Sequence, residues 1–325
     1  DAKLFKPRNS LGNTGGQFYV AKNPTYGAVF TYHLKDVPKT SKSLRIQSER
    51  KLNSDKEDVP FPGYEALSDE MNEKPASIIL TITDSEGNHI RNVKKNASNG
   101  SGRIAWNLRH KSYYPVRAGR AQSNRWWNPS GPYVTPGQYT ANLYLENNGS
   151  VEKLDGPVEF NVKPLRAGTL EGSSHEEYNS FRERISSLYI EMSKYQDEFN
   201  MMENKVQLLE KASMQLEEFS PELMKKISDF KAKYNAFDSD LNGNNARSEI
   251  GEWDKVTIST RVQIAMQGLS TSYGPTDLNK SNLEIAEKLF KKLATDVKMF
   301  KSELETLENE VKELNPPHLS GTGIN

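Results

Sequence analysis

The sequence contains no cysteine, and this absence excludes several kinds of chemistry. Without thiols the chain has no thiol nucleophile, no zinc–thiolate site and no disulfide framework, and cysteine usage leaves the redox compartment open. Histidine is scarce as well, and its five copies are scattered without the spacing of metal ligands: His33, His89, His110, His175 and His318. The chain also lacks a Gly-x-Ser-x-Gly elbow, a phosphate-binding glycine loop after a strand and a His-Glu-x-x-His helix. We therefore expect that this chain is not an enzyme, while a Ser–His–Asp triad assembled across the fold stays an open alternative.

Net charge is absent too, because 43 Lys and Arg balance 43 Asp and Glu. A neutral chain has no overall field that attracts nucleic acid or an anionic membrane surface, so we expect neither as a partner.

No apolar run approaches the roughly 20 residues of a membrane-spanning helix. The opening residues, DAKLFKPRNS, lack an initiator Met and the apolar region of a signal peptide, so we expect a mature or excised part of a longer protein. The length of 325 residues favours two domains.

The first half of the chain alternates with the two-residue period of half-buried strands. The segments GAVFTYHL, SIILTIT and QYTANLYL each place their apolar side chains on one face, and TDSEGN and ENNGS supply hairpin turns. The pattern predicts an antiparallel sandwich of roughly seven strands, with Trp106 as a core anchor. Residues 36–75 are charged, contain proline and show no sustained period, which predicts a long, partly ordered insertion.

After residue 165 the period changes to that of helices. One apolar seam has steps of three and four residues and contains Phe181, Ile185, Leu188, Met192, Tyr195, Phe199, Met202, Val206 and Leu209. A second contains Leu223, Ile227, Phe230, Tyr234, Phe237 and Leu241, with Ser220 as N-cap and Pro221 in the first turn. The last contains Leu289, Leu293, Val297, Phe300, Leu304, Leu307, Val311 and Leu314, and a shorter helix is expected around 258–269. We expect an antiparallel helical bundle whose return helix is broken near 242–256, with a dimer-forming coiled coil as the alternative.

Four segments resemble, in order, a known family: NPTYGAVFTYHLKD, LTITDSEGNHIRNV, GRIAWNLR and GPYVTPGQYTANLYL. They resemble the C-terminal region of large secreted Bacteroidetes proteins whose N-terminal part is a sortilin-like β-propeller, often labelled sialidase-like or glycosyl hydrolase. Within this region, the stretch from ITDSEGN to PGQYTANLYL is similar to the immunoglobulin-like domain of the flagellar hook-capping protein. The shared features are the Asp-x-x-Gly turn, the strand that ends in Trp and the Pro-Gly-x-Tyr strand. The charged insertion and the helical tail with MQGLSTSYGPTD also look like this family.

The resemblance implies an immunoglobulin-like β-sandwich over 1–165, with the insertion at about 36–75, followed by an antiparallel helical bundle over 166–325. It also implies a secreted or cell-surface location, at the periplasm-facing envelope of a Gram-negative bacterium. The implied function is non-catalytic: a structural, protein-interaction region that docks on the parent's own β-propeller and then on cell-envelope or surface-complex proteins. The alternatives are a carbohydrate-binding module of a glycoside-hydrolase-like surface protein, and an enzyme whose catalytic acids belong to the propeller. No residue of the propeller is carried onto this chain.

The segment HKSYYPVRAGRAQSNRWWNPSGPY combines bases and aromatics without an acid. Its candidate interaction residues are Tyr113, Tyr114, Arg117, Arg120, Arg125, Trp126 and Trp127. Aromatic faces stack on sugar rings, and Trp, Tyr and Arg dominate protein-interface hot spots. The two Trp residues are adjacent, so on a strand they face opposite sides. Packing within the chain, docking on a protein and binding of glycan all stay open, in that order of preference, and nucleic acid takes only the remainder.

The stretch DSDLNGNNARSE matches the calcium-loop template of an EF-hand. Its candidate ligands are Asp238, Asp240, Asn242, Asn244 and Glu249. Leu241, however, continues the seam of the second predicted helix, and a calcium loop cannot be helical at its first positions. Asn242 and Gly243 then form a helix stop. We therefore favour no metal and no cofactor here, with a calcium loop as the alternative.

Overall fold

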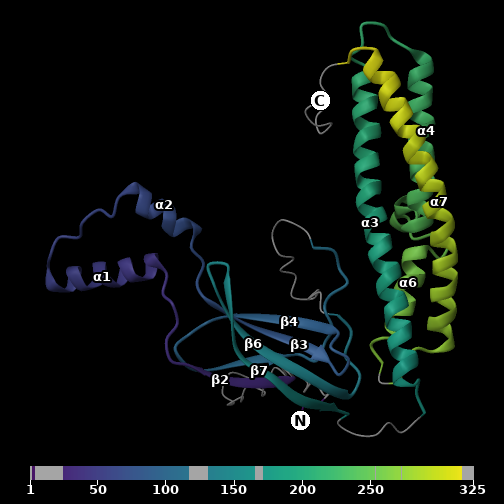
Figure 1. Cartoon of the computed structure of the whole chain (residues 1–325). Coiled ribbons are helices and arrows are strands. Elements are labelled where there is room, and N and C mark those ends of the chain that lie inside the picture. The colour runs from purple at the N-terminus through teal and green to yellow at the C-terminus, as the bar shows by residue number, and fades with distance from the viewer. Residues whose placement is uncertain are drawn as a thin grey trace, which may run out of the picture. The chain divides into compact units, whose positions relative to one another are not determined.

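The computed structural model describes residues 2–3, 25–116, 131–164, 171–252, 254–271 and 273–316. The chain divides into two compact units. The first comprises Asp1–Ser112 and Ser130–Ala167 and is built mainly of strands; the second comprises Tyr113–Pro129 and Gly168–Asn325 and is built of helices (Figure 1). Among the described residues, no helix combines the length and the apolar composition that a membrane crossing requires.

This division differs from the expected one in the segment that begins at Tyr113. We expected all of 1–165 to form the first unit, but the described residues 113–116 group with the helices. The physical reason is aromatic packing, because the rings of Tyr113 and Tyr114 both pack on Tyr189 of the first long helix. A two-residue alternation does not reveal a contact of this kind between distant parts of the sequence.

In the first unit, β2 (Ala28–Leu34) pairs antiparallel with β5 (Gly100–Trp106) in a two-stranded sheet. The other strands form one sheet in the order β1 (Ala2–Lys3), β7 (Ser150–Lys163), β6 (Gly137–Asn147), β3 (Ser77–Asp84) and β4 (His89–Asn96). All neighbours in this sheet are antiparallel except β1 and β7, which run parallel. The first unit therefore contains strands where the alternation predicts them.

Side chains of both sheets share one hydrophobic core. Most of the alternating positions are buried: Ala28, Tyr32, Leu34, Ile78, Leu80, Ile82, Tyr139 and Ala141. Trp106 is fully buried, as predicted, and its indole N–H donates a hydrogen bond of 2.9 Å to the carbonyl oxygen of Arg109. Three side chains from the same alternating faces, Phe30, Leu143 and Leu145, are only half-buried. They line a groove described in the next subsection.

The insertion, expected to be long and partly ordered, contains two helices that the sequence analysis did not identify, α1 (Ser41–Asp55) and α2 (Tyr64–Asn72). The Thr40 side chain caps α1 by accepting a hydrogen bond from the backbone N–H of Ser43. No side chain of α1 is buried, so the helix has no apolar seam. Apolar periodicity is the main helix signal in sequence, and its absence hid α1.

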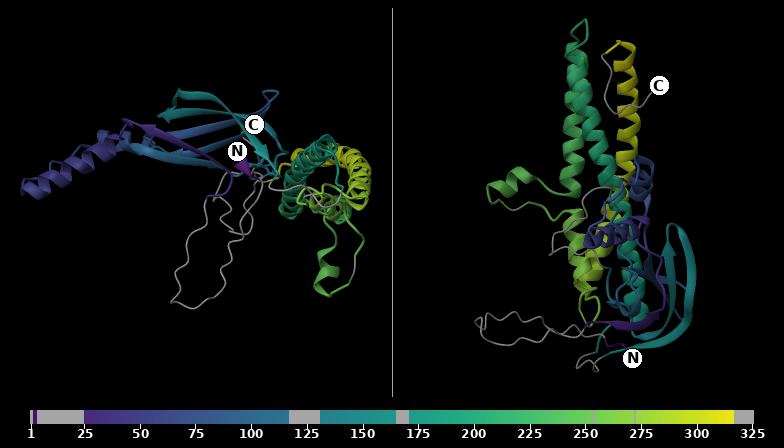
Figure 2. Two further views of the ribbon diagram at one scale, coloured as in Figure 1. Left: turned by 90° about the horizontal axis from the view of Figure 1, so that it is seen from below. Right: turned by 90° about the vertical axis from the view of Figure 1, so that its left-hand side faces the viewer.

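The second unit consists of α3 (His175–Ser213), α4 (Pro221–Leu241), α5 (Asn245–Glu249), α6 (Ile258–Gln267) and α7 (Asp277–Glu313). Helices α3, α4, α6 and α7 lie side by side and share one core (Figures 1 and 2). The predicted cap of α4 is present, since the Ser220 hydroxyl accepts from the backbone N–H of Leu223 and Pro221 follows it. Helices α4 and α6 flank the interval 242–256 in which we expected a break.

The apolar seams agree with the predicted ones except at two positions of α7. On α3, all nine predicted residues belong to the core, with Tyr195 half-buried and the others buried. On α7, Leu289 and Leu314 are 39% and 52% exposed, and Phe290 is buried in place of Leu289. Residues 289 and 290 lie four and three positions before Leu293, so spacing alone allows either, and the larger ring faces the core. Leu314 lies at the C-cap, beyond the last packed turn.

The predicted turn MQGLSTSYGPTD joins α6 to α7 through a set of caps. The Thr276 hydroxyl accepts from the backbone N–H of Asn279, whose side chain accepts from the backbone N–H of Thr276, which completes a capping box. The Asn279 amide also donates to the carbonyl oxygen of Ile264 at 2.7 Å, and the backbone N–H of Ser173 donates to Tyr273 at 2.8 Å. These bonds hold α6, α7 and the entrance of α3 together at one end of the unit.

Candidate functional site

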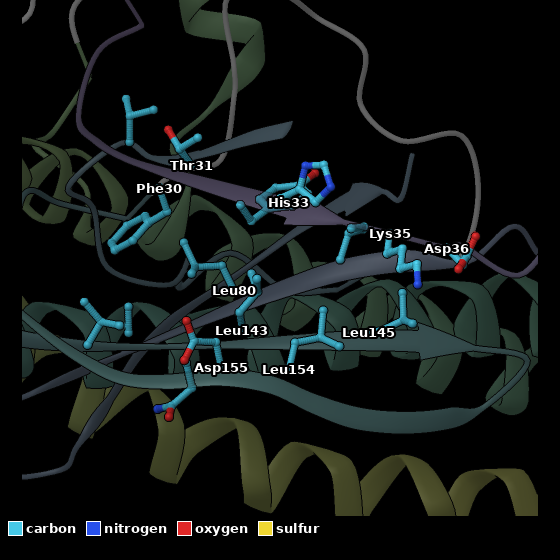
Figure 3. A pocket seen from close by; sticks show the side chains of 16 residues that line it. Phe30, Thr31, His33, Lys35, Asp36, Leu80, Leu143, Leu145, Leu154 and Asp155 are labelled. Carbon is cyan, nitrogen blue, oxygen red and sulfur yellow. The ribbon is translucent and has the colours of Figure 1, made fainter. Parts of the chain in front are cut away.

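A groove of about 880 Å³ lies between strand β2 and the β6–β7 hairpin in the first unit (Figure 3). One side is the continuous run 29–36, which is β2 and the two residues after it. The other side is mainly apolar, with Leu80 from β3, Leu143 and Leu145 from β6, and Leu154 and Val158 from β7, and it also contains Asn142 and Asp155. The groove therefore places a backbone edge opposite an apolar wall.

The β6–β7 hairpin has the length and the bend that form this wall. The pairing of β6 with β7 is irregular between Ala141 and Tyr144, which marks a bulge, and bulges bend the strand that carries them. Gly156 lies opposite with φ +108°, and a Cβ there would approach the carbonyl oxygen of Ala141 to 2.7 Å. The close approach of the two strands therefore requires glycine at this position.

Strand β2 is an edge strand. Among the described strands it pairs with β5 alone, and the groove follows its other side along the whole strand. Residues 28–34 contain no Pro and no charged side chain other than His33 if it is protonated, so the edge has none of the usual features that block pairing. The hydroxyl of Tyr32, a residue that also lines the groove, is buried and has no hydrogen-bond partner in the described part of the chain.

Charged groups lie at one end of the groove and on its β7 wall. Lys35 and Asp36 follow β2, and Asp155 is paired with Leu143 within the wall, where its carboxylate accepts from the backbone N–H of Gly156 (Figure 3). His33 points to Ser101, with Nδ1 and Oγ 3.3 Å apart. Within the described ranges no group of three His, Asp or Glu side chains is placed to hold a metal ion. The groove offers backbone hydrogen bonding along β2 and apolar contact with the facing wall.

The predicted aromatic and basic segment is described in part. The rings of Tyr113 and Tyr114 are stacked at 5.2 Å with 25° between their planes, and Tyr189 meets them edge-on at 5.2 and 5.1 Å. Burial raises the pKa of the Tyr114 phenol. This cluster fits the first of the three roles considered for the segment, packing within the chain. The remaining candidates lie outside the described residues: Arg117, Arg120, Arg125, Trp126 and Trp127.

The calcium-loop candidates divide between a helix and the turns after it. Helix α4 runs through Asp238 and Asp240 and ends at Leu241, which is buried, in agreement with the helical interpretation of this stretch. The Asp240 carboxylate pairs with Lys255, and the Asp238 carboxylate accepts from the Asn242 side-chain amide at 2.7 Å. The backbone N–H of Asn244 donates to the Asp254 carboxylate at 2.8 Å.

The rest of the stretch forms a helix stop. Gly243 has φ +99°, the left-handed conformation that ends a helix, and Glu249 is the last residue of α5. The first two candidate positions, Asp238 and Asp240, thus lie in regular helix, whereas an EF-hand loop wraps its early ligands around the ion.

Sequence reasoning did not find the groove or Tyr189. Two features of the sequence could have indicated the groove. Strand β2 alternates without Pro or charged residues that would block pairing at its edge, and the strands of the β6–β7 hairpin are longer than β2. Tyr189 carried no signal, because it lies next to the predicted seam of α3 rather than on it.

No protein-family model, no curated protein and no solved structure matches this chain. The function is therefore inferred from the residues and their geometry.

Proposed function

We propose that the chain is a non-catalytic protein-interaction region in which an immunoglobulin-like β-sandwich precedes an antiparallel helical bundle. Following the resemblance of its segments, it belongs to a secreted or surface-attached β-propeller protein of the Bacteroidetes type. Its first partner in this proposal is that propeller, and further partners are proteins of the cell envelope.

Two observations support an immunoglobulin-like sandwich. The two sheets share one core around Trp106, whose ring lies 5.4 Å from Tyr139 and 6.0 Å from Phe160 of the opposite sheet. The Tyr139 hydroxyl donates to the carbonyl oxygen of Thr135 at 2.7 Å, which is the upstream hydrogen bond of a tyrosine corner. For the bundle, the support is the single core shared by the four longer helices of the second unit.

The groove beside β2 is the observation that carries the proposed activity. Because the edge of β2 is free among the described strands and the facing wall is apolar, an extended segment of a partner protein can pair with β2 and place alternate side chains against Leu143, Leu145 and Leu154. Strand addition of this kind takes its affinity from main-chain hydrogen bonds and its specificity from alternate side-chain pockets. The ligand class that fits is a peptide with apolar residues at every second position.

A peptide selection with a matched pair of variants tests this proposal. A random peptide library displayed on phage is selected on the purified chain, and enriched peptides are measured against Val158→Glu and Val151→Glu. Both valines are exposed on β7, at 47% and 58%, but Val158 lines the groove and Val151 does not.

We expect the enriched peptides to alternate apolar and polar residues. Their affinity should fall at least about tenfold, or about 1.4 kcal/mol, for Val158→Glu and stay unchanged for Val151→Glu. Amide hydrogen exchange of β2 should slow when such a peptide is bound. If no peptide is enriched, or if both variants bind equally, the groove is not the docking site.

A further inference from the structure

The insertion forms an arm, residues 39–73, whose side chains contribute nothing to either hydrophobic core. It comprises α1, the linker 56–63 and α2. Five large apolar side chains of the arm are exposed: Leu44 at 52%, Val59 at 39%, Phe61 at 64%, Tyr64 at 83% and Met71 at 86%. The rings of Phe61 and Tyr64 contact one another at 5.1 Å and are otherwise open. Exposed aromatic and Met side chains gathered on one element are typical of an interaction surface.

Polar contacts hold the arm together. Arg45 of α1 donates to both carboxylate oxygens of Glu70 at 2.7 and 2.8 Å, and to Glu49 at 2.6 Å. The Glu73 carboxylate accepts from the backbone N–H and the hydroxyl of Ser41. A 15-residue helix with no buried side chain is marginal by itself, because most helical stability in proteins comes from packing of an apolar face. The ion pairs of Arg45 with Glu49 and Glu70, which we call the clamp, thus hold the two helices of the arm together, while the large apolar side chains given above stay exposed to solvent.

The two halves of the arm carry opposite charge. Residues 39–51 hold five cations and one anion, and residues 57–73 hold six carboxylates and no cation. The clamp uses Arg45, Glu49 and Glu70. In the described part of the chain, no opposite charge lies within ion-pair distance of the other cations, Lys39, Lys42, Arg50 and Lys51, or of Glu57, Asp58, Glu65 and Asp69. Most of this complementary charge is therefore unused within one copy.

We propose that the arm is a dimerisation surface that binds the arm of a second copy. In a twofold dimer the same surface meets itself, so the basic α1 of one copy faces the acidic α2 of its partner, and the reverse contact forms at the same time. The uncovered aromatic and Met side chains are then buried between the arms. We name a second copy as the partner because the arm contains both a basic and an acidic half, which are complementary to each other. Binding to an unrelated protein would need only a basic or only an acidic surface.

Reversing the charge of each half separately tests the proposal, because combining the two reversed variants should restore dimerisation. The basic half is reversed in Arg50→Glu with Lys51→Glu, and the acidic half in Glu65→Lys with Asp69→Lys. All four side chains are exposed and none belongs to the clamp. The matched control is Lys288→Glu with Lys292→Glu on α7, which changes the net charge of the chain as much as the first pair. Mass is measured by sedimentation equilibrium of the full chain across a concentration series.

The wild type and the α7 control are expected to dimerise, with a dissociation constant that rises at least about tenfold from about 50 mM to about 500 mM NaCl. Each reversed pair is expected to be monomeric, because the reversed residues of one half then face side chains of their own sign in the other half of the second copy. An equimolar mixture of the two, and a chain with all four changes, are expected to dimerise again.

A monomeric wild type, dimers that survive either reversal, or a mixture that stays monomeric would overturn the proposal. Circular dichroism of each variant separates lost dimerisation from an unfolded arm, and restored association in the mixture excludes misfolding. The arm shares no residue with the groove beside β2, so the peptide selection succeeds or fails independently.

Discussion

Glu308 of α7 shows how one carboxylate is kept ionised among apolar neighbours. It is 8% exposed, and its two oxygens accept from the ammonium groups of Lys205 at 2.6 Å and Lys312 at 2.9 Å. Burial acts to raise the pKa of Glu308, but the two lysine hydrogen bonds outweigh it, so the pKa lies below its usual value. A group with a lowered pKa stabilises the fold above the pKa of the unfolded chain, about 4.3, and loses that contribution as pH falls through the folded value.

We predict that Glu308→Gln lowers the free energy of unfolding by about 1–2 kcal/mol at neutral pH, since the neutral amide loses the charge-assisted bonds. The difference from the wild type should shrink as pH falls below the pKa of the unfolded chain, about 4.3, and through the lower pKa of the folded carboxyl. Urea unfolding at neutral and acidic pH measures both values.

Glu310→Gln is the control, because its pair with Lys226 at 2.8 Å is exposed and exposed pairs contribute little. Equal destabilisation by Glu308→Gln at both pH values would contradict the assigned role of its charge.

At the scale of the element, α7 shows where apolar spacing stops being informative. Leu289 and Phe290 both satisfy the three-or-four-residue step to Leu293, and only the position of α3 decides between them. Phe290 is buried and its ring meets Tyr195 of α3 edge-on at 5.1 Å. Leu289 is one of the more exposed apolar side chains of the helix.

This neighbouring pair makes a direct test of the core of the second unit. We predict that Phe290→Ala lowers the free energy of unfolding by about 3 kcal/mol or more, because it removes a ring from a packed core. Leu289→Ala is expected to cost less than about 1 kcal/mol, since the side chain is already in contact with water. Thermal and urea unfolding followed at 222 nm compare the two, and a larger effect for Leu289→Ala would show that α7 is rotated from the orientation described.

The insertion shows that a helix without an apolar seam is not found from apolar spacing. Helices α1 and α2 were missed because they lack buried apolar side chains. Helices α3, α4 and α7 were predicted because each has a long apolar seam. The N-cap Thr40 and the pair of Arg45 and Glu49 at helical spacing were visible in the sequence. Such local signals are weak, and only the contact of Arg45 with Glu70 shows that the two helices belong together.

At the scale of the whole molecule, the chain has two separate cores. One contains only residues of the strand-rich unit, and the other only residues of the helical unit. We predict that Trp106→Ala destabilises the first unit by about 3–5 kcal/mol and leaves the second unchanged, because a large cavity affects the core in which it lies. Hydrogen exchange read by mass spectrometry resolves the units, since peptides from β3 and β6 should lose protection while those from α3 and α7 keep it.

The buried Phe300 of α7 provides the reciprocal variant, Phe300→Ala, with loss of protection expected in the helical unit alone. Loss of protection in both units from either substitution would show that they fold as one cooperative body.

By itself, the sequence determined the strands β2, β3 and β6 and the helices α3, α4 and α7, because their period and caps are local properties of consecutive residues. It also determined the stop of α4, where the seam reaches Leu241 immediately before Asn242 and Gly243. Only the tertiary structure decided that Phe290 rather than Leu289 is buried on α7, that the rings of Tyr113 and Tyr114 pack on Tyr189, and that a groove lies beside β2. The physical reason is that burial and edge exposure depend on which distant element packs alongside, and no local pattern contains that information.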